Sequence, residues 1–360
     1  MKTTSPETEK GINGRLLKGS RPSFPPSALT QTSPRLTWLA IMRGITILLV
    51  VMNHVQLIDL STGGNHPFCE QASQWFAPFR MPLFIFSSGG LLFLSRIDKG
   101  RNTPEVYRDK WGRIMTPFFF FVIVYYGIKW LMAGIVKTPT TLSMSDFLLS
   151  FVYFGGRPSA PLWFLATLMT LMLLYPLFRW LAKVPWRMHT FLPLTIALRF
   201  VDLSAYEVYN VFNLLQLHHY LVYFFFGIYF FRFRLYKFFD GMGIFFVLLC
   251  IYLGLALTNT DFGTASAGIM LMVSLSRLLE KPLPGLCRHW RDYVFQVYLM
   301  GMICQGVVEL VIWKRWCYNE SFFAVFYVLN IAAGLYIPVL VAKMVERCPV
   351  KFIRLCFGLK

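Results

Sequence analysis

Two ionisable residues, Arg43 and His54, lie within one apolar stretch of the sequence, residues 35–57. The stretch is long enough for a membrane-spanning helix, and an ionisable side chain inside a membrane is costly enough to indicate a functional site. Eleven residues at about 100° each bring the two side chains within about 20° of one helix face and about 16 Å apart along the axis. The alternative is an arginine bonded to a backbone carbonyl and a histidine that merely ends the span.

Asp59 follows His54 by five residues and is a candidate to orient its imidazole ring. A carboxylate at that level would raise the basicity of the ring. The alternative is a solvated aspartate at the start of a polar loop, and the sequence favours neither interpretation.

A second apolar stretch contains Pro82, which removes a backbone hydrogen bond and kinks a helix, followed by a run of small residues, Ser87-Ser88-Gly89-Gly90. Small residues let a neighbouring helix or a thin ligand approach the backbone. We therefore treat Ser87 and Ser88 as candidate substrate-binding residues, although close helix packing is the commoner reason for such a run.

Lys110 and Arg113 are three residues apart and share one face of a predicted helix. Two cations on one face suit a phosphate or pyrophosphate, whereas ordinary anchoring at the membrane surface is the alternative. Trp163 opens a later apolar stretch. Its ring is predicted either to belong to an interfacial aromatic belt or to form the wall of a sugar site.

The composition indicates the kind of protein that holds these residues. Of 360 residues, 56% are hydrophobic and only 14% are charged, against about 25% charged in a soluble domain. Apolar runs of spanning length predict an all-α integral membrane protein, a bundle of about ten transmembrane helices. The predicted spans are about 36–57, 76–95, 114–135, 161–182, 188–203, 211–231, 241–258, 262–279, 291–313 and 320–344.

The formal net charge is +18, and 27 of the 35 Lys and Arg residues lie in the two tails and in alternate connections. This bias follows the positive-inside rule and predicts that both termini are cytoplasmic. We predict a disordered cytoplasmic tail over residues 1–34, a transmembrane domain over 35–345 and a cytoplasmic C-terminal tail over 346–360. No soluble reading element accompanies the basic residues, so the charge indicates a lipid bilayer rather than nucleic acid.

Taken in chain order, these segments resemble the membrane acyltransferase-3 family, whose bacterial members acylate extracytoplasmic glycans. Arg43, ten residues and then His54 resemble the signature of the family's first helix. The other segments that resemble family motifs are Pro82–Gly89 in the second helix, Lys110 and Arg113 with Pro117 before the third, and Leu162–Leu165 and Val297–Leu299 further on. The resemblance covers about residues 35–345.

Two positions depart from the family pattern. Ala40 stands where the family often has an aspartate, and Gly301 stands where it often has a histidine. Neither is the expected catalytic group, so the departures concern the substrates more than the class of reaction.

The resemblance implies an O-acyltransferase of the bacterial inner membrane with no bound cofactor or metal. Acyl-CoA, with acetyl-CoA as the first choice, is the implied donor, and its phosphates would meet Lys110 and Arg113. Arg43 would stabilise or position the donor, while His54 would act as general base or as an acyl-carrying nucleophile. A hydroxyl of a glycan or lipid-linked saccharide would accept the acyl group at the outer face.

Two other classes of function compete with this interpretation. Intramembrane Arg43 and His54 would also suit a transporter's substrate or proton pathway, but the sequence lacks the paired broken helices of many transporters. A structural subunit of a glycan-export complex would leave the two residues without a role.

Overall fold

The computed structural model describes residues 37–55, 57, 66–132, 143–203, 205–206, 210–258, 260–313 and 320–359. All of them belong to one unit, Thr32–Lys360. Asp59 and the predicted tail, residues 1–34, lie outside the described residues, so the expectations for them stay predictions.

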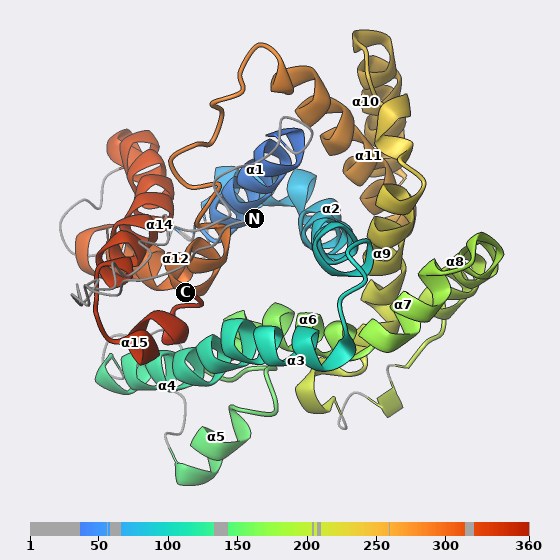
Figure 1. The fold of residues 1–360 in the computed structure, drawn as a ribbon. Coiled ribbons are helices and arrows are strands. Elements are labelled where there is room, and N and C mark those ends of the chain that lie inside the picture. The colour runs from blue at the N-terminus through green and yellow to red at the C-terminus, as the bar shows by residue number, and fades with distance from the viewer. Residues whose placement is uncertain are drawn as a thin grey trace, which may run out of the picture. The chain divides into compact units, whose positions relative to one another are not determined.

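Every regular element among the described residues is a helix, which confirms the all-α prediction. The helices are α1 Thr37–Asn53, α2 Pro67–Leu92, α3 Thr103–Lys110, α4 Thr116–Leu131, α5 Met144–Leu149, α6 Trp163–Leu173, α7 Tyr175–Ala182, α8 Pro185–Arg199, α9 Gln216–Arg232, α10 Met242–Leu257, α11 Asp261–Glu280, α12 Val294–Val307, α14 Phe323–Glu346 and α15 Lys351–Cys356 (Figure 1). Short π-helical turns adjoin three of these: η2 Phe93–Ile97 after α2, η3 Trp111–Met115 before α4 and η8 Val308–Trp313 after α12.

Six helices among the described residues are long and apolar enough to cross a membrane: Pro67–Ile97, Thr103–Leu131, Val211–Arg232, Asp261–Glu280, Val294–Trp313 and Phe323–Glu346. A seventh candidate is a pair of helices, α6 with its preceding turn and α7, that meet at an angle of 52°. The count of about ten spans is therefore not confirmed. α1 and α10 occupy two further predicted spans but have only 17 and 16 residues, fewer than the roughly 20 that cross a bilayer without help.

α2 packs most extensively against α9, and it also contacts α1 and α11. A Cβ atom added at Gly89 would lie 2.0 Å from the carbonyl oxygen of Phe224, and one at Gly227 would lie 2.1 Å from that of Phe86. The two backbones approach this closely only because neither glycine has a side chain. Gly89 is thus a helix-packing residue.

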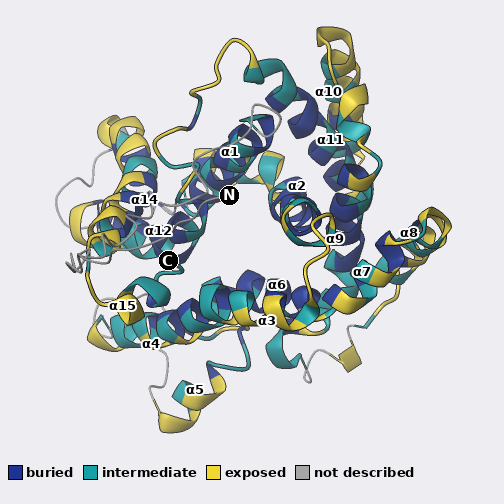
Figure 2. Cartoon of the chain, viewed as in Figure 1, coloured by how far each residue is buried: buried dark blue, intermediate teal, exposed yellow. Residues whose placement is uncertain are grey.

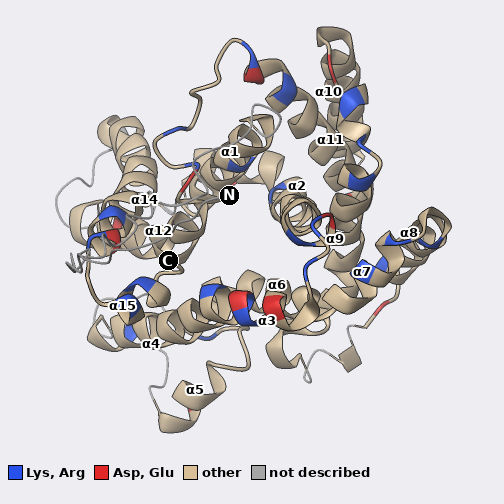
Figure 3. Ribbon diagram, in the orientation of Figure 1, with Lys and Arg blue, Asp and Glu red and all other residues tan. Residues whose placement is uncertain are grey.

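Large apolar side chains are exposed on several helices, as expected of a surface that faces lipid. Only Tyr252 is buried on α10, whereas Leu257 of the same helix is 79% exposed. Figure 2 shows the same contrast between the mainly buried α1 and α2 and the largely exposed α10 and α8. Figure 3 shows that the long helices carry little charge. Together with the apolar spans, this surface identifies an integral membrane protein.

The predicted C-terminal tail, residues 346–360, contains a helix that packs on the rest of the chain. α15 contacts α4, and the Gln296 side chain donates from Nε2 to the carbonyl oxygen of Phe357 at 2.9 Å. Gly358 has a φ of +69°, and a Cβ there would lie 2.5 Å from the Phe295 ring. The segment is therefore anchored, and its side of the membrane stays a prediction.

Candidate functional site

α1 carries both Arg43 and His54. It packs against α2, α11, α12 and α14, and ten of its 17 residues are buried. Both ionisable side chains are half-buried, Arg43 in the first half of the helix and His54 directly after its last residue, Asn53. The helix therefore links two polar regions about 16 Å apart along its axis, which we call the Lys110 end and the His54 end.

The imidazole of His54 is oriented by its own helix. Its Nδ1 lies 2.6 Å from the carbonyl oxygen of Val50. A carbonyl only accepts hydrogen bonds, so Nδ1 is the donor, and in the neutral ring the lone pair lies on Nε2. The backbone thus does for His54 what the sequence suggested for Asp59, which lies outside the described residues.

Hydrogen bonds from α2 and α12 fix the His54 end of α1, and α14 supports the bond from α12. Ser73 of α2 donates to Asn53 Oδ1 at 2.5 Å. Gln305 of α12 donates from Nε2 to the Val51 carbonyl oxygen at 2.9 Å and to Asn330 Oδ1 of α14 at 2.9 Å. The backbone beside His54 is thus held by buried amides, and a buried, bonded amide favours one arrangement of its helices.

The glycine at the position where the family often has a histidine lies at a helix crossing. A Cβ at Gly301 would lie 3.1 Å from the carbonyl oxygen of Gly334 and 3.7 Å from Val51. α12, α14 and α1 therefore meet where a larger side chain would separate them. The departure from the family pattern has a packing reason.

Cations from four elements gather at the Lys110 end. Lys110, at the end of α3, lies within electrostatic range of Arg43 on α1, Arg96 in η2 and Arg113 in η3. We call these four residues the cationic cluster. Arg96 forms an ion pair with Asp109, which leaves a net positive charge in the cluster. The structure thus brings Arg43 to the pair Lys110 and Arg113, which the sequence proposed separately from it.

The connection between α11 and α12 covers α1 beside Arg43. Trp290 donates from Nε1 to the Gly44 carbonyl oxygen at 2.9 Å, and a Cβ at Gly44 would lie 2.5 Å from Cys287 Cβ. Asp292 of the same connection lies within electrostatic range of Arg43. Burial raises the pKa of the Cys287 thiol to about 11, so this thiol stays protonated near neutral pH and has no nucleophilic role.

A cavity of about 380 Å³ is lined by Trp163 together with Arg80, whereas His54 is not among its lining residues. Arg80 is half-buried on α2, between Pro78 and Pro82, and lies within electrostatic range of His54. The Trp163 ring lies 5.5 Å from the Tyr220 ring, which lines the same cavity. Trp163 is therefore a cavity wall, one of the two roles that its sequence context allowed.

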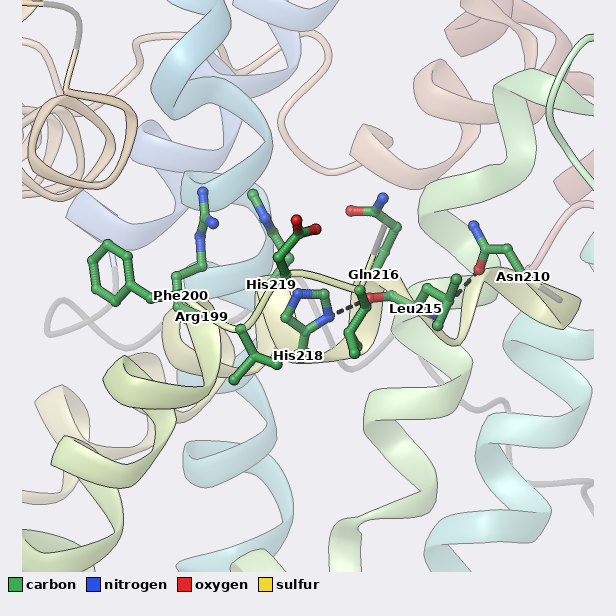
Figure 4. A pocket seen from close by; sticks show the side chains of 10 residues that line it. Arg199, Phe200, Asn210, Leu215, Gln216, His218 and His219 are labelled. Carbon is green, nitrogen blue, oxygen red and sulfur yellow. Dashed lines mark hydrogen bonds between the residues drawn. The ribbon is translucent and has the colours of Figure 1, made fainter. Parts of the chain in front are cut away.

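An adjoining cavity of about 430 Å³ shares Arg199 and His219 with the cavity beside Arg80. Figure 4 shows the side chains of Arg199 and His219 projecting side by side in the same direction. His218 instead turns back on its own helix, where Nδ1 donates to the carbonyl oxygen of Leu215. The two cavities thus form a continuous polar region that α2, α6, α8, α9 and α11 line.

Ser87 and Ser88 both bond to the backbone of α2. Each hydroxyl donates to the carbonyl oxygen of Phe84 at 2.9 Å. Ser87 is buried and Ser88 is half-buried, next to the Gly89 contact with α9. This geometry favours the packing interpretation for Ser87 and leaves only Ser88 with some accessible surface.

Arg80, Arg199 and His219 were absent from the candidates chosen by sequence. Arg80 carried the signal that selected Arg43, an arginine flanked by apolar residues, but it lay near a predicted helix end, where such a residue is common. Arg199 lay in the predicted span 188–203, a short run that also contains Asp202. Only the packing of α2 against α9 brings Arg80 toward Arg199. Among the described residues, no cluster of His, Cys, Asp or Glu has the arrangement of a metal site.

A family model described as an acyltransferase domain matches residues 36–342. The match covers most of the chain and confirms the resemblance drawn from Arg43, His54 and the later segments. No curated protein and no solved structure matches this chain.

Proposed function

Since the chain belongs to the acyltransferase-3 family, we propose that it moves an acyl group from cytoplasmic acyl-CoA to a hydroxyl of an extracytoplasmic saccharide. The acceptor is a glycan or a lipid-linked saccharide, and the protein resides in a bacterial inner membrane with both termini cytoplasmic. The acyl group is proposed to be acetyl, the smallest that the donor class offers.

One observation carries this proposal: a single helix joins a cationic cluster to an oriented imidazole. Arg43 lies with Lys110 and Arg113 at one end of α1, and His54 holds its Nε2 lone pair about 16 Å away at the other. A donor with a phosphorylated head and a long thin arm fits that separation. Its phosphates need cations, its thioester needs a base or a nucleophile, and the arm holds the two groups far apart.

The cationic cluster supplies the first half of that chemistry. The ammonium of Lys110 and the guanidinium of Arg113 suit phosphate oxygens, and Arg96, paired to Asp109, would hold η2 against α3. Arg43 is the member of this cluster that α1 carries, the helix that also leads to His54, and it would position the donor or stabilise charge on it. The half-buried Ser88 would lie along the path of the thin arm.

His54 supplies the second half, by one of two routes. As general base, Nε2 accepts the proton of the acceptor hydroxyl while that oxygen forms a bond to the thioester carbonyl carbon and the coenzyme A thiolate leaves. As nucleophile, Nε2 forms a bond to the thioester carbonyl carbon and the coenzyme A thiolate leaves. The acceptor hydroxyl oxygen then bonds to that carbon, the bond from Nε2 breaks, and the hydroxyl proton passes to the freed Nε2. Both routes require the lone pair on Nε2, which the Nδ1 bond to Val50 supports. Trp163 would stack on the apolar face of the accepting sugar.

Mass spectrometry of surface glycans tests the proposal directly. Cells lacking the gene, complemented with the wild-type chain, should regain a glycan heavier by one acyl group, and complementation with His54→Gln should not restore it. The mass difference also identifies the acyl group. An unchanged glycan together with altered uptake of a solute would indicate the transporter instead.

A further inference from the structure

We infer that the acceptor saccharide carries an oxyanion, a carboxylate or a phosphate, which Arg80 and Arg199 bind at the His54 end of α1. The inference rests on the acyl transfer proposed above and adds the charge of its acceptor. It rests on Arg80 and Arg199, which line the same cavity and were not among the candidates predicted from the sequence.

Arg80 lacks a counter-ion in the described part of the chain. Its Nε and Nη1 atoms are buried without a hydrogen-bond acceptor, and the group that acts on it electrostatically is the Tyr220 hydroxyl rather than a carboxylate. A guanidinium taken out of water without a partner is costly to the fold. The cost is offset when a bound anion supplies the missing acceptors, and the cavity that Arg80 lines gives such an anion access.

Arg199 supplies a second guanidinium to the same cavity. It donates a hydrogen bond to the Tyr223 hydroxyl, while its Nε is buried with no partner among the described residues. Two guanidiniums and one carboxylate, that of Asp261, line this cavity. Asp261 lies in the first turn of α11, where the helix dipole already stabilises its charge. Asp202 lines the adjoining cavity and already has an interaction within the protein.

The remaining lining fits a sugar that bears such a group. Trp163 and Tyr220 offer flat aromatic surfaces, and Tyr223 and His219 offer polar atoms close to Arg199. A planar guanidinium binds a carboxylate or phosphate through two parallel bonds, which a neutral hydroxyl cannot match. A uronate or phosphorylated sugar would therefore be held with its apolar face on the rings and its charge on the arginines, within electrostatic range of His54.

Equilibrium binding without any acyl donor tests this inference in the full-length protein in nanodiscs. The probes are a hyaluronan tetrasaccharide, which carries glucuronate carboxylates, and the same tetrasaccharide with its carboxyls reduced to alcohols. The wild type should bind the charged probe more tightly. Arg80→Gln and Arg199→Gln should each weaken the charged probe by about 10- to 100-fold, as for one lost charge-assisted hydrogen bond, and leave the reduced probe within about twofold.

Arg157→Gln is the matched control, because Arg157 already bonds Asp146 at 2.9 Å and should not affect either probe. Arg80→Lys, which keeps the charge, should retain part of the preference if Arg80→Gln fails to fold. A wild-type protein that binds both probes equally, or a preference that survives both Gln variants, overturns the inference. If the inference fails in this way while acyl transfer is intact, the proposed function still stands. If binding depends on the arginines but the protein transfers no acyl group, the proposed function is refuted and the anion site stands.

Discussion

His54 donates from Nδ1 to the carbonyl oxygen of Val50, one helical turn earlier, at 2.6 Å. The bond ties the tautomer of the imidazole to the end of α1, so the position of Nε2 depends on the backbone of that helix rather than on a second side chain. Gln305 of α12 holds the same stretch of backbone through its bond to the Val51 carbonyl oxygen, and Asn330 of α14 bonds Gln305 in turn. The predictions below follow from this arrangement and from the packing around it.

Replacing His54 by Gln should abolish acyl transfer while the protein still folds. Glutamine keeps the polarity and approximate size of the side chain but cannot accept a proton near neutral pH, and a positioned acid–base group contributes about 10²–10⁴ in rate. Turnover of acyl-CoA by purified variants measures the loss. His189→Gln, at an exposed histidine on α8, is the control and should keep normal turnover. Near-normal transfer by His54→Gln would exclude both roles assigned to this ring.

Replacing Lys110 and Arg113 together by Ala should raise KM for the acyl donor more than it lowers kcat. Charges that bind the donor phosphates equally in the ground state and the transition state appear in KM. Steady-state kinetics with acetyl-CoA and with a short thioester that lacks the phosphates separate the two effects. Arg108→Ala, at an exposed position of the same helix, should change neither constant. Equal losses with both donors would mean that the pair only anchors α3.

Replacing Gly89 by Ala should destabilise the protein by about 1–3 kcal/mol, the cost of overpacking a tight contact. The added Cβ would lie 2.0 Å from the backbone oxygen of Phe224, so α2 and α9 would have to separate. Thermal unfolding in detergent measures the change as a lower Tm. Gly127→Ala is the control, since nothing lies within 4 Å of a Cβ there and alanine favours a helix interior, so its Tm should not fall. Equal Tm values for the two variants would show that α2 and α9 can separate without a loss of stability, which would contradict the prediction.

Reporters should locate both termini in the cytoplasm. Fusions after residue 100 and at the C-terminus should report the cytoplasm, and an insertion near residue 62 should report the outside, because basic residues concentrate in alternate connections. Enzymatic reporters that are active on only one side of the membrane make the measurement. An external location for residues 96–113 would remove the cationic cluster from the compartment that holds acyl-CoA and would refute the proposed donor entry.

The sequence alone determined the helical membrane class and the family, and it predicted that Arg43 and His54 share one helix face. Those conclusions depend on local quantities, namely the length of apolar runs, the fixed rotation per residue of a helix and the order of short motifs. The prediction that Lys110 and Arg113 share one face was also local. The number of spans was not, because the apolar runs predicted as two of the spans contain helices of only 17 residues in α1 and 16 in α10.

Only the tertiary structure decided the partner of His54 and the surroundings of Arg80. The partner of the His54 Nδ1 proved to be the Val50 backbone, and Arg80 from α2 lines a cavity with Arg199 from α8 and Trp163 from α6. These side chains are far apart in the chain, and they meet because α2, α6 and α8 all pack against α9, with α2 brought close to it by Gly89 and Gly227. Periodicity within a segment cannot predict such a meeting, since it depends on how closely two different helices approach.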